Sequence, residues 1–208
     1  MTTVANTEST QPTRERILNA ALICFAERGY AATGMREIAR QVGIRAPSLY
    51  NHFAGKREIL LALQERMGPA RMTRALADME PPLSPAVLHE RLQALLMDLW
   101  RDVEENRLMR LFCGEALHDP AIGRMLEQQI FGQEKQHLAQ AIAAALGGAS
   151  PTTAQQQLAQ TYAELCIAIG VGKRFQLLLG DDDPVRLEAI CDETRILFNA
   201  VAGLLPGQ

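Results

Sequence analysis

Apolar side chains recur at helical spacing along most of the chain, and the interruptions of this pattern mark where helices begin and end. Between residues 33 and 56, one apolar face is interrupted by Gly43, and Pro47 then opens a second short helix. The inward-facing residues of these two helices are Ile38, Ala39, Val42, Leu49 and Phe53. The pattern predicts two short helices joined by a glycine-containing turn.

The outward face of the second short helix carries Ser48, Tyr50, Asn51 and His52. Two helices joined in this way form a helix-turn-helix, whose second helix fits the major groove of duplex DNA. Hydrogen-bonding and aromatic side chains are what a surface needs when it meets bases and phosphates. We therefore interpret residues 34–53 as a helix-turn-helix motif.

The remainder of the chain shows no strand pattern and predicts an all-α protein of about nine helices. The first helix begins near Thr13, and a fourth runs over 56–79 with a kink or break at Gly68-Pro69, because proline removes a helical hydrogen bond. Further helices are expected over 84–104, 107–117, 120–146, 153–179 and 183–204. We expect a disordered tail over 1–12, a three-helix unit with a connecting helix over 13–66, and a larger bundle over 67–208.

Composition narrows the class of protein. No signal peptide or run of membrane-spanning length is visible, and the four cysteines lack metal-binding spacing, so we expect reduced thiols and no metal site. The net charge of −3 argues against DNA binding, yet it divides into +3 for residues 1–66 and −6 for the remainder. A basic head on an acidic body is typical of a DNA-binding domain attached to a domain that should avoid DNA.

Three segments carry a resemblance to a known family: RERILNAALICFAERGY (14–30), MREIARQVGI (35–44) and APSLYNHFAGKREILLAL (46–63). Together they closely resemble the DNA-binding domain of the tetracycline-repressor (TetR/AcrR-like) family. The third segment is the most specific, with its Leu-Tyr-x-His-Phe core followed by lysine. The resemblance implies a ligand-binding and dimerisation domain over 67–208.

The candidate DNA-binding residues are Arg36, Arg45, Ala46, Pro47, Ser48, Tyr50, Asn51, His52 and Lys56. Arg45 is suited to a bidentate contact with guanine, and Ser48 and Asn51 to hydrogen bonds with base edges. The resemblance implies that Tyr50, His52 and Lys56 contact phosphate. The alternatives are that Tyr50 is partly buried, that His52 holds the turn, and that the arginines are ordinary solvated charges.

A small-molecule cavity among the middle helices is implied by the resemblance. Its candidate lining residues are Met97, Trp100, Met109, Arg110, Cys113, Leu117, His118, Phe131, His137 and Tyr162. Methionines and aromatic residues at helical spacing are more often packing than ligand contacts. Arg110, His118 and His137 are better candidates, because a polar group in an apolar stretch needs a partner.

The last two helices have the 4-3-4-3 apolar spacing of a four-helix interface between two subunits. The residues in this register are Leu158, Tyr162, Leu165, Ile169, Gly172, Ile190, Thr194, Leu197, Val201 and Leu204. The alternative is that these faces only close the core of one subunit.

These observations favour a cytoplasmic, homodimeric regulator that needs no cofactor and is not an enzyme. Its expected partners are double-stranded operator DNA, a second copy of itself and an unidentified small-molecule effector, and no membrane. The leading hypothesis is a repressor that the effector releases from a palindromic operator. An activator, a redox sensor acting through Cys113, Cys166 or Cys191, and a helical-bundle enzyme or carrier stay open as alternatives.

Overall fold

The computed structural model describes residues 12–78, 83–180 and 183–206, and these residues are helical with no strand among them. They divide into two compact units, unit 1 (Met1–Glu65) and unit 2 (Arg66–Gln208). The tail expected over 1–12 falls, except for Pro12, outside the described residues. Among the described residues, no helix is both long and apolar enough to cross a membrane.

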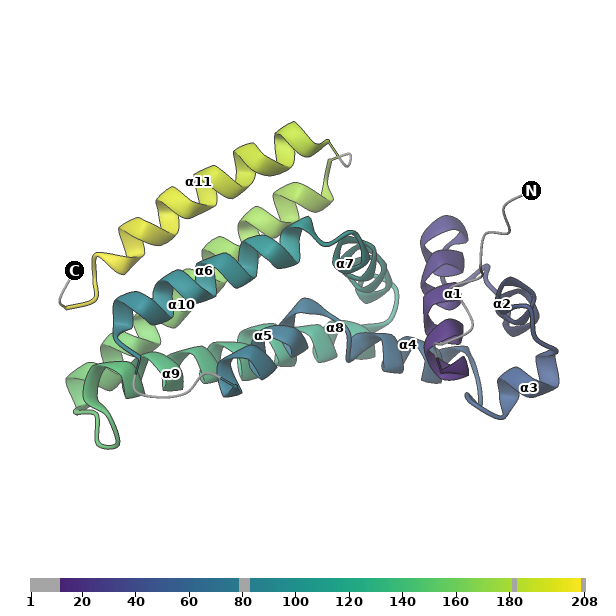
Figure 1. The fold of residues 1–208 in the computed structure, drawn as a ribbon, viewed down its shortest axis with the longest axis horizontal. Helices are drawn as coiled ribbons and strands as arrows, with labels where there is room; N and C mark the ends of the chain where they lie inside the picture. The colour runs from purple at the N-terminus through teal and green to yellow at the C-terminus, as the bar shows by residue number, and fades with distance from the viewer. Residues whose placement is uncertain (1–11, 79–82, 181–182, 207–208) are drawn as a thin grey trace, which may run out of the picture. The chain divides into compact units, whose positions relative to one another are not determined.

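Unit 1 consists of α1 (Thr13–Arg28), α2 (Met35–Val42), α3 (Ala46–Tyr50) and α4 (Lys56–Gln64) (Figure 1). Its core is the face that the apolar spacing predicts, and it includes Ile17, Phe25, Ile38, Leu49, Phe53 and Leu63, each 2% exposed or less. Burial of such side chains stabilises the unit by about 1.5–3 kcal/mol each relative to an exposed position. The short helix α3, too short to be stable alone, is therefore held by Leu49 and Phe53.

The turn between α2 and α3 depends on Gly43, which adopts φ +78° and ψ 29°. In this left-handed conformation the Ile44 N–H donates to the Ala39 carbonyl at 3.0 Å and the Gly43 N–H to the Arg40 carbonyl at 3.1 Å. These bonds close the end of α2 as in a Schellman motif, which favours glycine because it has no Cβ. The glycine-containing turn of the helix-turn-helix is confirmed.

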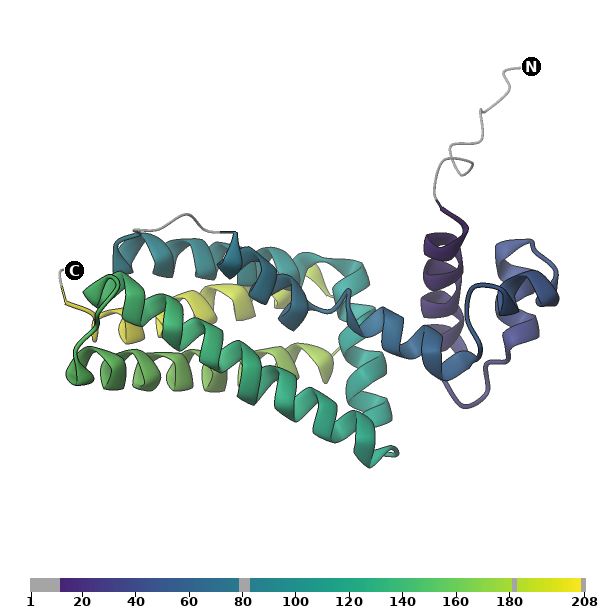
Figure 2. The ribbon, with the colours of Figure 1, turned by 90° about the horizontal axis from the view of Figure 1, so that it is seen from below.

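Unit 2 contains the remaining helices. They are α5 (Gly68–Ala77), α6 (Pro85–Arg101), α7 (Val103–Ala116), α8 (Pro120–Glu127), α9 (Lys135–Gly147), α10 (Thr153–Leu178) and α11 (Pro184–Ala202). A π-helical segment, η2 (Gln128–Glu134), joins α8 to α9, so that the three run on as one rod (Figure 2). The helices α9, α10, α11 and α6 pack in that order, each against the next.

Two helix boundaries test the sequence-based expectations. The break expected at Gly68-Pro69 is confirmed, because α4 ends at Gln64 and α5 begins at Gly68. The single helix expected over 84–104 is wrong at its end. Asp102 leaves the helix at φ −74° and ψ 115°, and its carboxylate accepts the N–H groups of Glu104 at 2.9 Å and Glu105 at 3.3 Å. An aspartate that caps the next helix therefore ends α6 at Arg101.

Candidate nucleic-acid interface and ligand cavity

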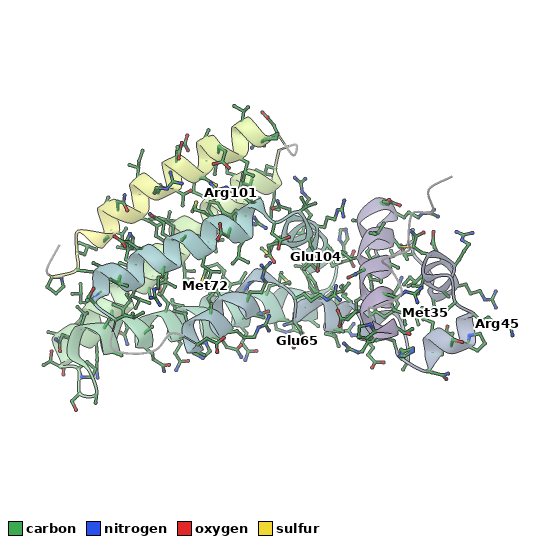
Figure 3. All side chains as sticks on the ribbon, viewed as in Figure 1. Met35, Arg45, Glu65, Met72, Arg101 and Glu104 are labelled. Carbon is green, nitrogen blue, oxygen red and sulfur yellow. The ribbon has the colours of Figure 1, made fainter. Side chains whose placement is uncertain are left out.

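The start of α3 presents a polar surface. Arg45, Pro47, Ser48, Asn51 and His52 are exposed, and the Tyr50 ring is 52% exposed, whereas Ala46 is half-buried. Arg45 lies at the edge of its unit, at the start of α3 (Figure 3), and Arg36 is exposed on α2. Because Leu49 and Phe53 anchor the other face, these side chains have a fixed base from which to meet a partner. The exposure of Tyr50 removes the alternative that it is partly buried in the core.

Lys56 has a structural role that the sequence reasoning missed. Its Nζ donates to the Tyr30 carbonyl at 2.6 Å and to the Ala31 carbonyl at 3.2 Å, and lies 4.3 Å from the Tyr30 ring centroid. Two of its three N–H groups are thereby used to attach α4 to the loop after α1. A phosphate contact by Lys56 would have to use the third.

The N-terminal end of α4 carries an anion of its own. The Glu58 carboxylate accepts the Ala54 N–H at 2.5 Å, just before the helix begins at Lys56. A carboxylate at this position interacts favourably with the helix dipole. A DNA phosphate at the same end of α4 would therefore meet the negative charge of Glu58.

Unit 2 encloses a cavity of about 190 Å³ with mostly apolar walls. Four of the residues expected from the sequence line it: Trp100, Met109, Cys113 and Tyr162. On α7 the lining positions are Glu105, Met109 and Cys113, one helical turn apart. The inward face of α7 therefore begins at Glu105, a residue that the apolar pattern did not mark.

The other six expected residues lie outside the cavity, and the register of their helices explains why. Arg110 is one position past Met109, is exposed, and donates to the Gly180 carbonyl at 3.1 Å. Leu117 is 86% exposed beyond the end of α7, and the exposed His118 bonds the Gly114 carbonyl at 3.0 Å. The remaining three are Met97, buried against other core residues, Phe131, which is 43% exposed, and His137, exposed and 3.4 Å from Thr73 Oγ1.

Polar groups at the cavity were mostly missed by the sequence reasoning. Glu105, Glu134, Arg174, His89 and Gln93 all line it. His89 is 4% exposed, with Nδ1 2.5 Å from the Tyr162 hydroxyl and Nε2 3.3 Å from Asn199 Oδ1. These bonds satisfy His89, which agrees with the rule that buried polar groups are hydrogen-bonded. The sequence signal for Arg174 was weak, because it follows Lys173 in α10 and the spacing does not show which of the two points inward.

The two cavity glutamates have strongly raised pKa values. Burial raises the pKa of Glu105 to about 7, against the opposing effects of the Gly68 N–H and of Arg174. Burial also raises the pKa of Glu134 to about 7, and the negative charge of Glu105 adds to this shift. Burial lowers the pKa of Arg174 from its ordinary value, while Glu105 opposes that change. The carboxyls therefore exchange protons near neutral pH.

The cysteines do not have the character of redox sensors. Cys24, Cys166 and Cys191 are buried and Cys113 is half-buried, and burial raises the pKa of each thiol above its ordinary value. Reactive cysteines are exposed and have a lowered pKa, since the thiolate is the nucleophile. Within the described ranges, no group of three or more metal-binding side chains is gathered at one place.

The expected register of the dimer surface on α10 and α11 is partly wrong. Tyr162, Ile190, Thr194 and Val201 are 8% exposed or less, because these helices use that face for the core of their own unit. Leu165, Gly172, Leu197 and Leu204 are exposed, while Leu158 and Ile169 are half-buried. An exposed stripe instead follows Thr161, Leu165, Ala168, Gly172, Phe175 and Leu179 on α10 and its end. This stripe keeps the 4-3 spacing, displaced from the expected register.

Comparison with known proteins identifies unit 1. Residues 17–63 match the family model described as "Bacterial regulatory proteins, tetR family". The HTH-type transcriptional activator FasR of Mycolicibacterium smegmatis is 47% identical over 53 residues, which are 26% of this chain and 24% of FasR. The HTH-type transcriptional regulator UidR of Escherichia coli K12 is 29% identical over 122 residues, 57% of this chain and 59% of UidR. The chain thus spans less than two thirds of the length of either relative.

Two solved structures resemble nearly the whole chain. A transcriptional regulator of the TerR/AcrR family from Aquifex aeolicus has a TM-score of 0.73 at 18% identity, covering 91% of this chain and 99% of its own. A SmeT–triclosan complex has a TM-score of 0.70 at 20% identity, covering 93% of this chain and 91% of its own. At such identities the likeness establishes the fold. Residues 17–63 thus match the tetR family of bacterial regulatory proteins, and the chain as a whole shares the fold of these solved structures.

Proposed function

We propose that the protein is a homodimeric transcriptional repressor of the cytoplasm that a small molecule releases from a palindromic DNA operator. The observation that carries this proposal is the exposed surface at the start of α3, where Arg45, Ser48, Tyr50 and Asn51 stand on a buried anchor. The N-terminal residues of a recognition helix are the ones that contact base edges. Arg45 and Asn51 would read bases, and Tyr50 and His52 would contact phosphate.

A dimer would bring two such surfaces onto one operator. The exposed apolar side chains of α10 and α11, among them Leu165, Phe175, Ile196 and Leu197, support self-association through these two helices. Contiguous exposed apolar surface of this kind marks an interaction site in a protein. Two helices from each subunit would form a four-helix interface with a two-fold axis, which matches the symmetry of a palindrome.

The cavity in unit 2 supports the effector role. It combines apolar walls with a few charged groups, which is the usual composition of a small-molecule site. SmeT, a protein that shares this fold, has been solved in complex with triclosan. An effector that binds better to the non-DNA state would weaken operator binding by linkage.

Selection of bound sequences from a random DNA pool tests the first part of the proposal. We expect a palindromic consensus whose half-sites are about one helical turn apart, or a comparable spacing. A transcription assay on a promoter with this consensus should then show repression. Activation in that assay would retain DNA binding but overturn the repressor role, and the lack of any enriched sequence would overturn both.

A further inference from the structure

The wall of the cavity in unit 2 holds two buried charged side chains that do not satisfy each other. Arg174 is 6% exposed and Glu105 is 3% exposed, and both line the cavity. Arg174 Nη2 lies 3.9 Å from Glu105 Oε1, which is beyond hydrogen-bond distance. Within the described part of the chain, neither terminal nitrogen of Arg174 nor Glu105 Oε2 has a hydrogen-bond partner. Such groups are costly to bury unless something else binds them.

A second carboxyl, that of Glu134, leaves the cavity with more negative than positive groups. Glu134 of η2 lines the same cavity and interacts electrostatically with Glu105, so the cavity wall holds two carboxyls and one guanidinium. The nearby Arg71 of α5 is already paired, with its guanidinium 2.6 Å from Asp102. When both carboxyls are ionised, this set carries a net negative charge next to apolar walls. A buried charge of this kind is stable only when paired.

The apolar part of the cavity wall and the cavity volume limit the shape of a ligand that would supply a positive charge. The apolar part of the cavity wall includes Leu92, Leu96, Trp100, Leu138 and Phe198. The volume of about 190 Å³ is below the range of about 300–1,000 Å³ that is usual for drug-sized ligands. The cavity therefore suits a small molecule with one charged group and a short apolar body.

We propose that this cavity binds a small organic cation, such as an arylalkylamine, with its cationic group between Glu105 and Glu134 and its apolar body against the Trp100 side of the cavity. The inference rests on the effector role proposed above, which it makes specific. The N–H groups of the cation would donate to Glu105 Oε2, the unpartnered acceptor, and its charge would offset that of the second carboxylate while Arg174 stays 3.9 Å from Glu105. A carboxylic acid would add a third negative group to a site with one guanidinium, and a neutral alcohol would leave the imbalance in place.

Glu105 also connects this site to the start of α5. Its carboxylate accepts the Gly68 N–H, and a Cβ on Gly68 would lie 2.6 Å from Glu105 Oε1. The same turn of α7 is tied to the residues before and within α5, because Glu104 pairs with Arg66 at 3.3 Å and Asp102 with Arg71. Only residues 65–67 separate α4 from α5 in the chain. A cation that draws Glu105 toward itself would thus disturb the segment that continues into α4.

Titrations monitored by the fluorescence of Trp100 test this assignment, because Trp100 is the single tryptophan of the chain and lines the cavity. The probes are 4-phenylbutylamine, 4-phenylbutan-1-ol and 4-phenylbutanoate, which share one apolar body, at pH 8. We expect the amine to bind about tenfold tighter than the alcohol, and the acid to bind more weakly than either. A tenfold ratio corresponds to about 1.4 kcal/mol.

Variants separate the counter-ion role from general packing. Glu134→Gln should weaken amine binding about tenfold, which is the loss of about 1.4 kcal/mol, while alcohol binding changes less than twofold. Glu127→Gln, an exposed glutamate on the preceding helix, is the matched control and should behave as the parent protein. Gly68→Ala should also weaken the amine, since its Cβ would displace the Glu105 carboxylate. Circular dichroism checks that each variant is folded.

The assignment is overturned if the amine fails to bind, binds no better than the alcohol, or keeps its full affinity in Glu134→Gln. A separate titration with operator DNA tests the effector role. An amine that binds with the expected preference but leaves operator affinity unchanged would support the cation site and contradict the effector role. If the protein binds its operator but shows no preference for the amine over the alcohol, the cation site is contradicted and the proposed DNA-binding function is not.

Discussion

At the scale of single residues, the polar side chains around α3 divide into exposed ones, which we propose to read bases, and ones that also hold the unit together. Arg45 and Asn51 are exposed, so their truncation should not disturb the core. Arg45→Ala or Asn51→Ala should lower preference at particular operator positions by about 1–3 kcal/mol, while non-specific binding persists. Competition between the consensus and single-base variants measures this preference. Arg124→Ala, an exposed arginine of α8, is the control, and unchanged preference in both variants would exclude direct readout.

Tyr50 and Lys56 test the difference between a phosphate contact and a structural contact. Tyr50→Phe should weaken binding to all sequences about equally without changing thermal stability, because the ring is 52% exposed. Lys56→Ala should destabilise unit 1 by about 1–3 kcal/mol, because the Tyr30 and Ala31 carbonyls lose their donor. If Lys56 also contacts phosphate, the salt slope of DNA binding should fall by about one unit. A changed stability with an unchanged slope would leave Lys56 with the structural role alone.

The cavity carboxyls predict a dependence of stability on pH. Their pKa values of about 7 in the folded protein lie above the ordinary value of 4.5, so the folded state holds protons that the unfolded state has released. Stability should therefore fall as the pH rises from about 4.5 to about 7, by up to about 1.4 kcal/mol per pH unit for each carboxyl, and then level off. The charged groups around Glu105 are Arg174, Arg71, Asp102 and Glu134.

Urea unfolding of unit 2, monitored by Trp100 fluorescence at a series of pH values, measures this decline in stability. Glu134→Gln should flatten the decline between pH 5 and pH 7, because glutamine does not titrate. The Glu127→Gln variant should keep the decline of the parent protein. A parent protein whose stability rises over this interval would contradict the raised pKa values.

At the scale of helices and turns, sequence patterns predicted most boundaries, and the exceptions have physical causes. Gly43, Pro47 and the Gly68-Pro69 break act through backbone geometry, which is local and therefore readable from the sequence. Asp102 ends α6 inside an apolar pattern that continues past it, and a capping aspartate looks the same in a sequence as a surface one. The π-helical segment η2 lies within a continuous helical pattern of apolar residues and has no signal of its own in the sequence.

Which residues line the cavity was less predictable than the helices around it. The side chain of Arg110 was favoured for its charge, yet the register of α7 turns Met109 and Cys113 inward instead. Glu105 lines the cavity because Asp102 starts α7 where it does, so one capping residue sets three lining positions. The same error of register placed Tyr162 and Thr194 on the outer face of their helices. Which side of a helix points inward depends on tertiary packing, and the spacing of apolar residues alone does not determine this.

The turn between α2 and α3 provides a test at the scale of elements. Gly43→Ala should destabilise unit 1 by about 1–2 kcal/mol, because φ +78° forces the new Cβ against the backbone. Gly114→Ala within α7 is the opposite control. No neighbouring atom lies within 4 Å of a Cβ there, so it should stabilise by about 0.5–1 kcal/mol. Thermal unfolding by circular dichroism measures both, and equal effects of the two substitutions would contradict the role of Gly43.

At the scale of the whole molecule, the two units carry different features. Unit 1 carries the basic charge and the exposed α3 surface, and unit 2 carries the cavity and the exposed apolar stripe. In the proposed mechanism, a single α3 surface makes few contacts with DNA, so high affinity would require two copies to bind one operator together. Dimerisation through unit 2 would supply this second copy. The effector then acts on an equilibrium between dimers that fit the operator and dimers that do not.

The proposed coupling of dimerisation to DNA binding can be tested at exposed leucines of α10 and α11. Leu165 is 38% and Leu197 is 40% exposed within one subunit, whereas the half-buried Ile169 also packs against the core. Leu165→Glu combined with Leu197→Glu should therefore place charge in the interface without unfolding the subunit. Carboxylates buried against each other and against leucine are costly, so the double variant should sediment as a monomer.

The DNA affinity of this monomer tests whether two α3 surfaces must bind one operator together. With only one α3 surface, it should bind a palindromic operator with nearly its non-specific affinity, because the second binding event is no longer intramolecular. Leu117→Glu places the same charge on an 86% exposed leucine away from α10 and α11, and it should keep both the dimer and the operator affinity. Analytical ultracentrifugation and DNA titration on the same samples measure the two properties. A double variant that is monomeric yet binds the palindrome as tightly as the parent protein would show that one α3 surface is enough for full affinity.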